Sequence, residues 1–162
     1  MIQIKPEIKK ALLDIDFFKR FEQLSKRFDE IKTPRKERLR YFDGEIVMES
    51  ISRLGYAVEF EPKEKFFIVK GGKIENYSFV VHIILDNGMV DMVWIVKNND
   101  KLILGLPIGE FSRIIFNPDY RIKKPIFGTY EDLDEILCTG FQMFEDFKRV
   151  LVSDRTDMMH KP

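Results

Sequence analysis

Residues 79 to 96 read FVVHIILDNGMVDMVWIV, and this stretch restricts the fold more than any other part of the chain. Two apolar runs flank Asn87 and Gly88, which tolerate the positive φ angles that a type I′ turn requires. Antiparallel pairing around this turn sets Asp86 opposite Met89. The stretch therefore predicts a β-hairpin with a defined register.

The two faces of this hairpin differ in composition. One face is wholly apolar and carries Phe79, Val81, Ile83, Leu85, Val90, Met92, Trp94 and Val96. The other face carries Val80, His82, Ile84, Asp91, Val93 and Ile95. A wholly apolar face must be covered, and helices cover it most simply. We therefore expect a helical layer on the first face.

Segments in which side-chain character alternates with a period of two residues precede and follow the hairpin. YAVEFEP and KFFIVK precede it and LILGLP follows it, while KGGK and KNNDK offer hairpin turns. KGGK is expected to lead into the strand that ends at Leu85. Because each strand is joined to the next by a short link, residues 55 to 107 predict an antiparallel meander of five strands.

Helical spacing dominates the N-terminal third of the chain. Apolar residues recur at this spacing from Pro6 to about Ile31, and Pro6 suits the first helical turn because it lacks an N–H group. Thr33 is expected to cap a second helix that Pro34 opens and Gly55 closes in a left-handed conformation. Residues 1 to 54 are therefore expected to form a helical region.

The C-terminal third predicts one long helix after a short helix, IGEFSRIIF, and a loop, NPDYRIKKPIFG. The long helix is expected to run from Thr129 or Tyr130 to about Val152 and to bury Leu133, Leu137, Phe141, Phe144, Phe147 and Leu151. Gly140, beside this apolar stripe, is expected to permit a close approach of the backbone. Residues 153 to 162 are expected to be a frayed tail.

These elements predict a single domain of 162 residues in the α+β class. The helical region covers residues 1 to 54, the sheet residues 55 to 107, and the loop and last helix residues 108 to 152. In this arrangement an antiparallel five-stranded meander sheet is covered on one face by helices from both termini.

The composition argues against several classes of protein. The 27 basic and 27 acidic side chains cancel, which disfavours a general nucleic-acid binder. Cys138 is the only cysteine, so it excludes an internal disulfide, and we expect it to be buried as a small apolar residue. The two histidines disfavour a histidine-based metal site, and no phosphate loop or dinucleotide motif indicates a cofactor.

The N-terminal sequence and the length of the apolar runs bear on where in the cell the protein is found. The N-terminus is charged throughout, which disfavours a signal peptide, and no run approaches the roughly 20 apolar residues of a membrane helix. We therefore expect a cytoplasmic protein without a membrane partner.

His82 and Asp91 are the residues of the hairpin that could support chemistry. They are diagonal neighbours in the predicted register, so one alternative is a ligand-binding or enzymatic pocket in which they act as a general base pair. Trp94 would have to line the same pocket, but the pairing turns it to the opposite face. Because no serine elbow or cysteine partner accompanies the pair, we assign no catalytic residue and favour a half-exposed histidine beside a carboxylate.

Residues 26 to 40, KRFDEIKTPRKERLR, form a basic segment with seven basic and three acidic side chains. A second alternative is therefore a regulatory module that binds nucleic acid through Arg35, Lys36, Arg38 and Arg40. The interspersed acidic residues make nucleic acid a less favoured partner than an acidic protein.

The last predicted helix is strongly acidic. Its acidic residues are Glu131, Asp132, Asp134, Glu135, Glu145 and Asp146. The first four offset the positive end of the helix dipole, and a solvated helix face is one interpretation of all six. The sharper hypothesis is that these six residues dock a basic partner, such as the active site of a nuclease, with Tyr120 and Tyr130 as aromatic anchors.

Four stretches between residues 40 and 152 suggest a family. They are LDNGMVDMVWIV, GLPIGEF, KKPIFGTYEDLDEIL and FEDFKRVL, and they include Gly105, Pro107, Pro125, Phe127 and Tyr130. In the order of its elements the chain resembles the small immunity proteins of bacterial polymorphic-toxin and contact-dependent growth inhibition systems. This resemblance implies a cytoplasmic, non-enzymatic protein that binds one cognate toxin and neutralises it by occluding its active site. It leaves the oligomeric state open.

Overall fold

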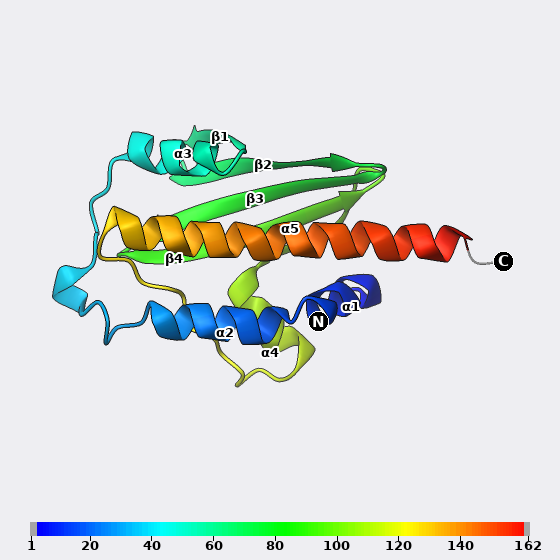
Figure 1. Cartoon of the computed structure of the whole chain (residues 1–162), viewed down its shortest axis with the longest axis horizontal. Coiled ribbons are helices and arrows are strands. Elements are labelled where there is room, and N and C mark those ends of the chain that lie inside the picture. Colours follow the sequence, from blue (N-terminus) through cyan, green and yellow to red (C-terminus); the bar gives the residue numbers. More distant parts are fainter. Residues whose placement is uncertain (1–2, 161–162) are drawn as a thin grey trace.

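The computed structural model describes residues 3 to 160, with the side chains of residues 3 to 153. Its centre is an antiparallel five-stranded sheet with the order β1-β2-β3-β4-β5, which confirms the predicted meander (Figure 1). The strands are β1 (Ala57–Glu61), β2 (Phe66–Ile74), β3 (Tyr77–Asp86), β4 (Met89–Asn98) and β5 (Lys101–Pro107). The α+β class follows from this sheet and the helices around it.

The hairpin of β3 and β4 has the predicted register. Asp86 pairs with Met89, and the pairing continues regularly to the far ends of both strands. Asn87 and Gly88 have φ angles of 51° and 74°, as the turn requires. The face that carries Trp94 is buried, whereas the side chains of the opposite face are all half-buried.

The prediction of a turn at KGGK is wrong. Gly71 and Gly72 lie inside β2, where the register with β3 shifts between Lys70 and Lys73, and the chain turns at Glu75, whose φ is 54°. The reason is a helix on the covered face: a Cβ atom at Gly71 would come within 2.8 Å of the Phe144 ring. The glycine therefore serves helix–sheet contact, and periodicity alone could not separate this role from a turn.

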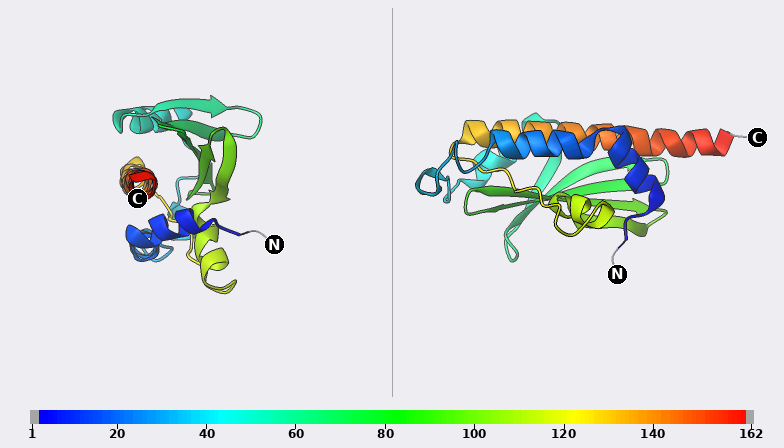
Figure 2. Two further views of the ribbon diagram at one scale, coloured as in Figure 1. Left: turned by 90° about the vertical axis from the view of Figure 1, so that its right-hand side faces the viewer. Right: turned by 90° about the horizontal axis from the view of Figure 1, so that it is seen from below.

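The described part of the chain also contains seven helical segments. They are α1 (Pro6–Asp14), α2 (Phe17–Arg27), the 3₁₀ turns η1 (Arg35–Glu37) and η2 (Ile108–Glu110), α3 (Gly44–Arg53), α4 (Phe111–Ile115) and α5 (Tyr130–His160). Figure 2 shows α2, α3 and α5 on one side of the sheet, with α5 running along its length. Helices from both termini thus cover the apolar face, as predicted.

Both predicted N-terminal helices are shorter than expected. Asp16, with a φ of 58°, breaks the first one and redirects Phe17 into the core, where its ring contacts Trp94. Of the second, only η1 and α3 are helical, because the backbone is extended at Arg38 and Asp43 and Leu39 N–H donates to the Phe127 carbonyl. Gly55 closes α3 with a φ of 98°, as predicted.

The last helix begins at Tyr130, one of the two predicted start residues, and all six predicted inward side chains are buried. Gly140 allows the predicted close approach, because a Cβ atom there would lie 2.6 Å from the Met92 sulfur. The helix continues to His160, so the prediction that it ends near Val152 is wrong. The expected frayed tail is helical up to this residue, and residues 161 and 162 lie outside the described range.

An aromatic cluster joins the sheet to its helices. Trp94 is fully buried, and its ring lies 5.1 to 5.8 Å from the rings of Phe17, Phe111, Phe144 and Phe147. The prediction that Cys138 is buried is wrong. Its side chain is exposed because it lies beside the apolar stripe of α5 and faces the end of α3, near Leu54.

Candidate functional site

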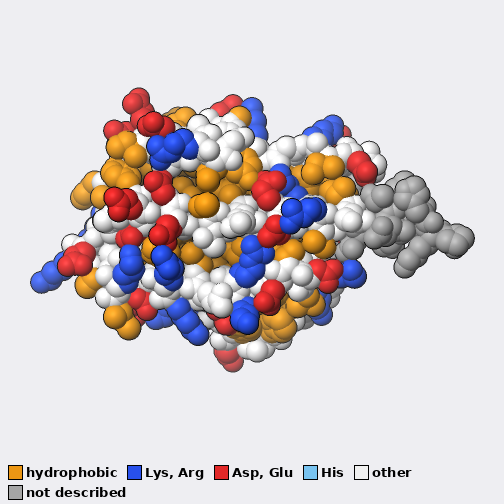
Figure 3. Space-filling view, viewed as in Figure 1, with side chains coloured by type: hydrophobic (Ala, Val, Ile, Leu, Met, Phe, Trp, Pro, Cys, Tyr) orange, Lys and Arg blue, Asp and Glu red, His pale blue; other side chains and the backbone are white. Residues whose placement is uncertain are grey.

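Three of the four acidic residues at the start of α5, namely Asp132, Asp134 and Glu135, form ion pairs with basic residues of other elements, whereas Glu131 is exposed. The carboxylate of Asp132 is 2.7 Å from Lys32 Nζ, and Arg27 donates two hydrogen bonds to Glu135. Arg53, at the end of α3, lies 3.5 Å from Asp134. Figure 3 shows the result as acidic and basic side chains interspersed over the helical face.

The acidic residues further along α5 are also paired within the chain. Asp146 forms an ion pair of 2.9 Å with Arg20 of α2, and Glu145 forms one of 2.7 Å with Lys148. The Tyr56 hydroxyl donates to Glu145, and burial, together with this hydrogen bond, raises the pKa of that tyrosine. A basic partner would therefore compete with ion pairs that already exist. Binding of a partner by these six residues stays a prediction.

The two proposed aromatic anchors are also engaged within the chain. The Tyr130 hydroxyl accepts a hydrogen bond of 2.8 Å from Asp43 N–H, at the start of α3. The Tyr120 hydroxyl donates to Glu22 of α2, and this hydrogen bond raises the pKa of Tyr120 to about 12. Both tyrosines are half-buried, so their contacts hold loops against helices.

His82 and Asp91 lie on the side of the sheet opposite the helices. The imidazole is 4.5 Å from the Phe66 ring, centroid to centroid, and burial lowers its pKa. Asp91 forms an ion pair of 3.5 Å with Lys124 of the loop before α5. Burial raises the pKa of Asp91, although Lys124 opposes this shift. His82 therefore contacts Phe66, whereas Asp91 contacts Lys124. Burial on this apolar surface favours the neutral form of the His82 imidazole.

That surface, which we call the open sheet face, consists of Phe66, Ile68, Val80, His82, Ile84, Val93 and Ile95. All seven side chains are half-buried, and the helices α2, α3 and α5 lie on the other side of the sheet (Figure 2). Charged residues frame it, including the ion pair between Glu59 and Lys70 at 3.3 Å. The side of an antiparallel sheet that faces solvent is usually polar, so this composition is unusual.

Sequence analysis placed five of these residues, Val80, His82, Ile84, Val93 and Ile95, on one face and gave that face only the alternative role of a pocket at His82 and Asp91. A signal was present, because VVHIIL and MVWIV are nearly continuous apolar runs. In an antiparallel sheet, such runs place apolar side chains on both faces. With helices on one side of the sheet, the second apolar face becomes a candidate interaction surface.

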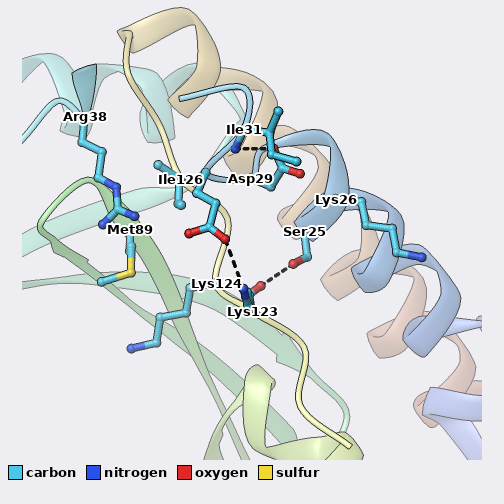
Figure 4. Close-up of a pocket in the computed structure, with 10 residues that line it drawn as sticks. Ser25, Lys26, Asp29, Ile31, Arg38, Met89, Lys123, Lys124 and Ile126 are labelled. Atoms are coloured by element: carbon cyan, nitrogen blue, oxygen red, sulfur yellow. Dashed lines mark hydrogen bonds and ion pairs between the residues drawn. The ribbon is translucent and has the colours of Figure 1, made fainter. Parts of the chain in front are cut away.

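The basic segment forms one wall of a groove, the basic groove (Figure 4). The groove has a volume of about 460 Å³ and is lined by Ser25, Lys26, Asp29, Glu30, Ile31, Arg38, Met89, Lys123, Lys124 and Ile126. Backbone hydrogen bonds of 2.7 and 2.8 Å join Ile126 to Phe28 and Phe127 to Gly88. The groove therefore lies where the end of α2, the β3–β4 turn and the loop before α5 meet.

Comparison of the chain with models of protein families, with curated proteins and with solved structures found no match. Within the described range, no helix has both the length and the apolar character needed to cross a membrane. Among the described residues, His, Cys, Asp and Glu side chains form no group of three or more that could hold a metal ion.

Proposed function

We propose that this chain is a non-enzymatic binding protein that contacts a protein partner through the open sheet face. The observation that supports this proposal is the apolar composition of that face, whose central side chains lie on β3 and β4. Contiguous apolar patches with a charged rim are typical of protein–protein interfaces.

Both apolar burial and rigidity would favour binding of a partner at this face. Each Å² of apolar surface that a partner covers contributes roughly 25 cal/mol, before the costs of association. Most of these side chains are β-branched and stand on the central strands of the sheet, so they lose little conformational freedom on binding. The face therefore suits a rigid, preorganised interface.

We further propose that the partner is a toxin, and that the chain neutralises it by covering its active site. This part of the proposal rests on the resemblance of the chain to bacterial immunity proteins. Charge pairing within the helical face supports the sheet, rather than α5, as the contact surface.

The two alternative functions have weaker support. A general base pair requires His82 and Asp91 to act together, but they contact Phe66 and Lys124 respectively. Nucleic-acid binding by the basic segment would have to overcome the acidic residues within the same groove.

The proposal is tested with Val93→Lys, which places a charge in the open sheet face. Its matched control is Gln142→Lys, which adds the same charge on the exposed surface of α5. We expect Val93→Lys to weaken binding to the proposed toxin partner roughly tenfold or more, and to abolish growth rescue in cells that co-express the two proteins. Gln142→Lys should bind like the wild type.

Equal thermal unfolding of both variants would show that the loss does not come from misfolding. Wild-type affinity of Val93→Lys would rule out the open sheet face. Loss of binding in Gln142→Lys alone would indicate that the interface lies on α5.

A further inference from the structure

The basic groove carries positive charge that its own acidic residues do not balance. It has four cations and two acids, and Glu30 pairs with Lys123 at 3.4 Å while Lys124 pairs with Asp91. The second acid, Asp29, accepts hydrogen bonds from the backbone N–H groups of Ile31 and Lys32, and so closes the turn after α2.

Arg38 is the groove cation best placed to meet an incoming anion. No ion pair to its guanidinium is found among the described side chains, and its Nε atom is buried without a hydrogen-bond partner. Figure 4 shows the guanidinium beside Met89, at the groove. An under-satisfied, partly desolvated guanidinium gains more from an anion than a fully hydrated one.

The backbone around Arg38 is held in place. Leu39 N–H donates to the Phe127 carbonyl at 3.0 Å, and the Arg38 Cβ lies so close to Gly88 that an added Cβ atom there would approach to 2.7 Å. The stem of the side chain is therefore positioned before any ligand arrives, which reduces the entropic cost of binding.

The walls of the groove favour one kind of anion. Met89 and Ile126 make part of it apolar, and Asp29 and Glu30 would repel a polyanion such as nucleic acid. A single carboxylate flanked by apolar side chains fits both properties, because guanidinium binds carboxylate in a planar, two-bonded geometry.

We infer that the basic groove binds a Glu or Asp side chain of an acidic, partly apolar segment of the partner protein, with Arg38 as the principal contact. This inference rests on the proposed function, because it assumes a protein partner. Lys124 lines the groove and also pairs with Asp91 beside the open sheet face, so one partner can cover both surfaces.

The test requires no partner. The whole ¹⁵N-labelled chain is titrated with the peptide acetyl-Leu-Glu-Leu-amide, and the amide signals of Gly88, Met89 and Ile126 are followed. We expect saturable shifts with this peptide and roughly tenfold weaker binding of acetyl-Leu-Gln-Leu-amide, which lacks the charge. Arg38→Gln should reduce binding of the Glu peptide to the level of the Gln peptide, whereas Arg38→Lys should retain part of it.

Equal shifts by the two peptides on the wild-type chain would overturn the inference, and this comparison does not depend on any variant. Stronger binding of a short single-stranded oligonucleotide at the same amides would also overturn it, in favour of a nucleic-acid site. Gln142→Lys, on the exposed surface of α5, should leave the peptide titration unchanged, and the titration itself involves no partner protein. Failure of this inference is therefore distinguishable from failure of the open-sheet-face proposal.

Discussion

At the scale of single residues, Lys148 shows how a charge is accommodated between helix and sheet. Its side chain is only 7% exposed, and Nζ donates a hydrogen bond of 2.6 Å to the Gly71 carbonyl and pairs with Glu145. The same ammonium lies 5.2 Å from the centre of the Phe144 ring. It thus satisfies a backbone carbonyl at the bulge of β2, where the strand pairing is interrupted.

We expect Lys148→Ala to lower the free energy of unfolding by about 2 kcal/mol, since it leaves the Gly71 carbonyl without this donor and removes the buried aliphatic stem. Chemical denaturation measures this loss. Lys148→Met, which keeps an apolar chain of similar length, should lose less. Arg149→Ala is the control, because Arg149 is exposed and its ion pair with Asp146 should contribute less than about 1 kcal/mol. Equal losses in the Arg149 and Lys148 variants would refute this role.

At the scale of elements, the start of α5 is held by reciprocal capping. The Thr129 hydroxyl accepts a hydrogen bond from Asp132 N–H, and the Asp132 carboxylate accepts one from Gly128 N–H. Lys32 adds a charged contact to the same carboxylate. Burial alone would raise the pKa of Asp132, but these hydrogen bonds and the lysine charge lower it overall. The residue is therefore both a helix cap and a link to the segment after α2.

This cap predicts a pH dependence of stability. Because the pKa of Asp132 is lower in the folded chain, its contribution is complete above the ordinary value of about 3.9 and is lost as the pH falls through the folded-state pKa. Asp132→Asn should remove this contribution, costing about 1 kcal/mol at neutral pH and less in strong acid. Denaturation curves across this range, with Asp119→Asn as an exposed control, measure the difference. A constant gap between wild type and Asp132→Asn down to strong acid would contradict the assignment.

At the scale of the whole molecule, the two sides of the sheet have different chemistry. The helical side carries interspersed opposite charges, and the chain has a formal net charge of zero (Figure 3). The open sheet face is mainly apolar around one histidine. Association through these surfaces would respond differently to salt, because screening weakens charge attraction but leaves apolar burial nearly unchanged.

We therefore expect the affinity for the partner to change less than about threefold between low and physiological salt, and calorimetry to give a negative heat-capacity change on binding. Titration calorimetry of the purified chain and its partner at two salt concentrations measures both quantities. A steep loss of affinity with salt would instead support docking by the acidic residues of α5.

The sequence by itself determined the order of the strands and the register of the central hairpin. Local signals were sufficient here, because Asn87 and Gly88 specify a turn and the period of two assigns each side chain to a face. The apolar stripe of α5 was also predicted from a local signal, because its apolar residues recur at helical spacing. These features depend on neighbours in the chain.

Only the tertiary structure decided the break at Asp16, the role of Gly71, the exposure of Cys138 and the pairing of the acidic residues of α5. Each depends on residues distant in sequence, such as Phe144 across from Gly71 or Lys32 beside Asp132. The open sheet face belongs to the same group, because a strand pattern shows that a face is apolar but not whether another element covers it. The physical reason is that coverage and ion pairing depend on long-range contacts, which local periodicity does not encode.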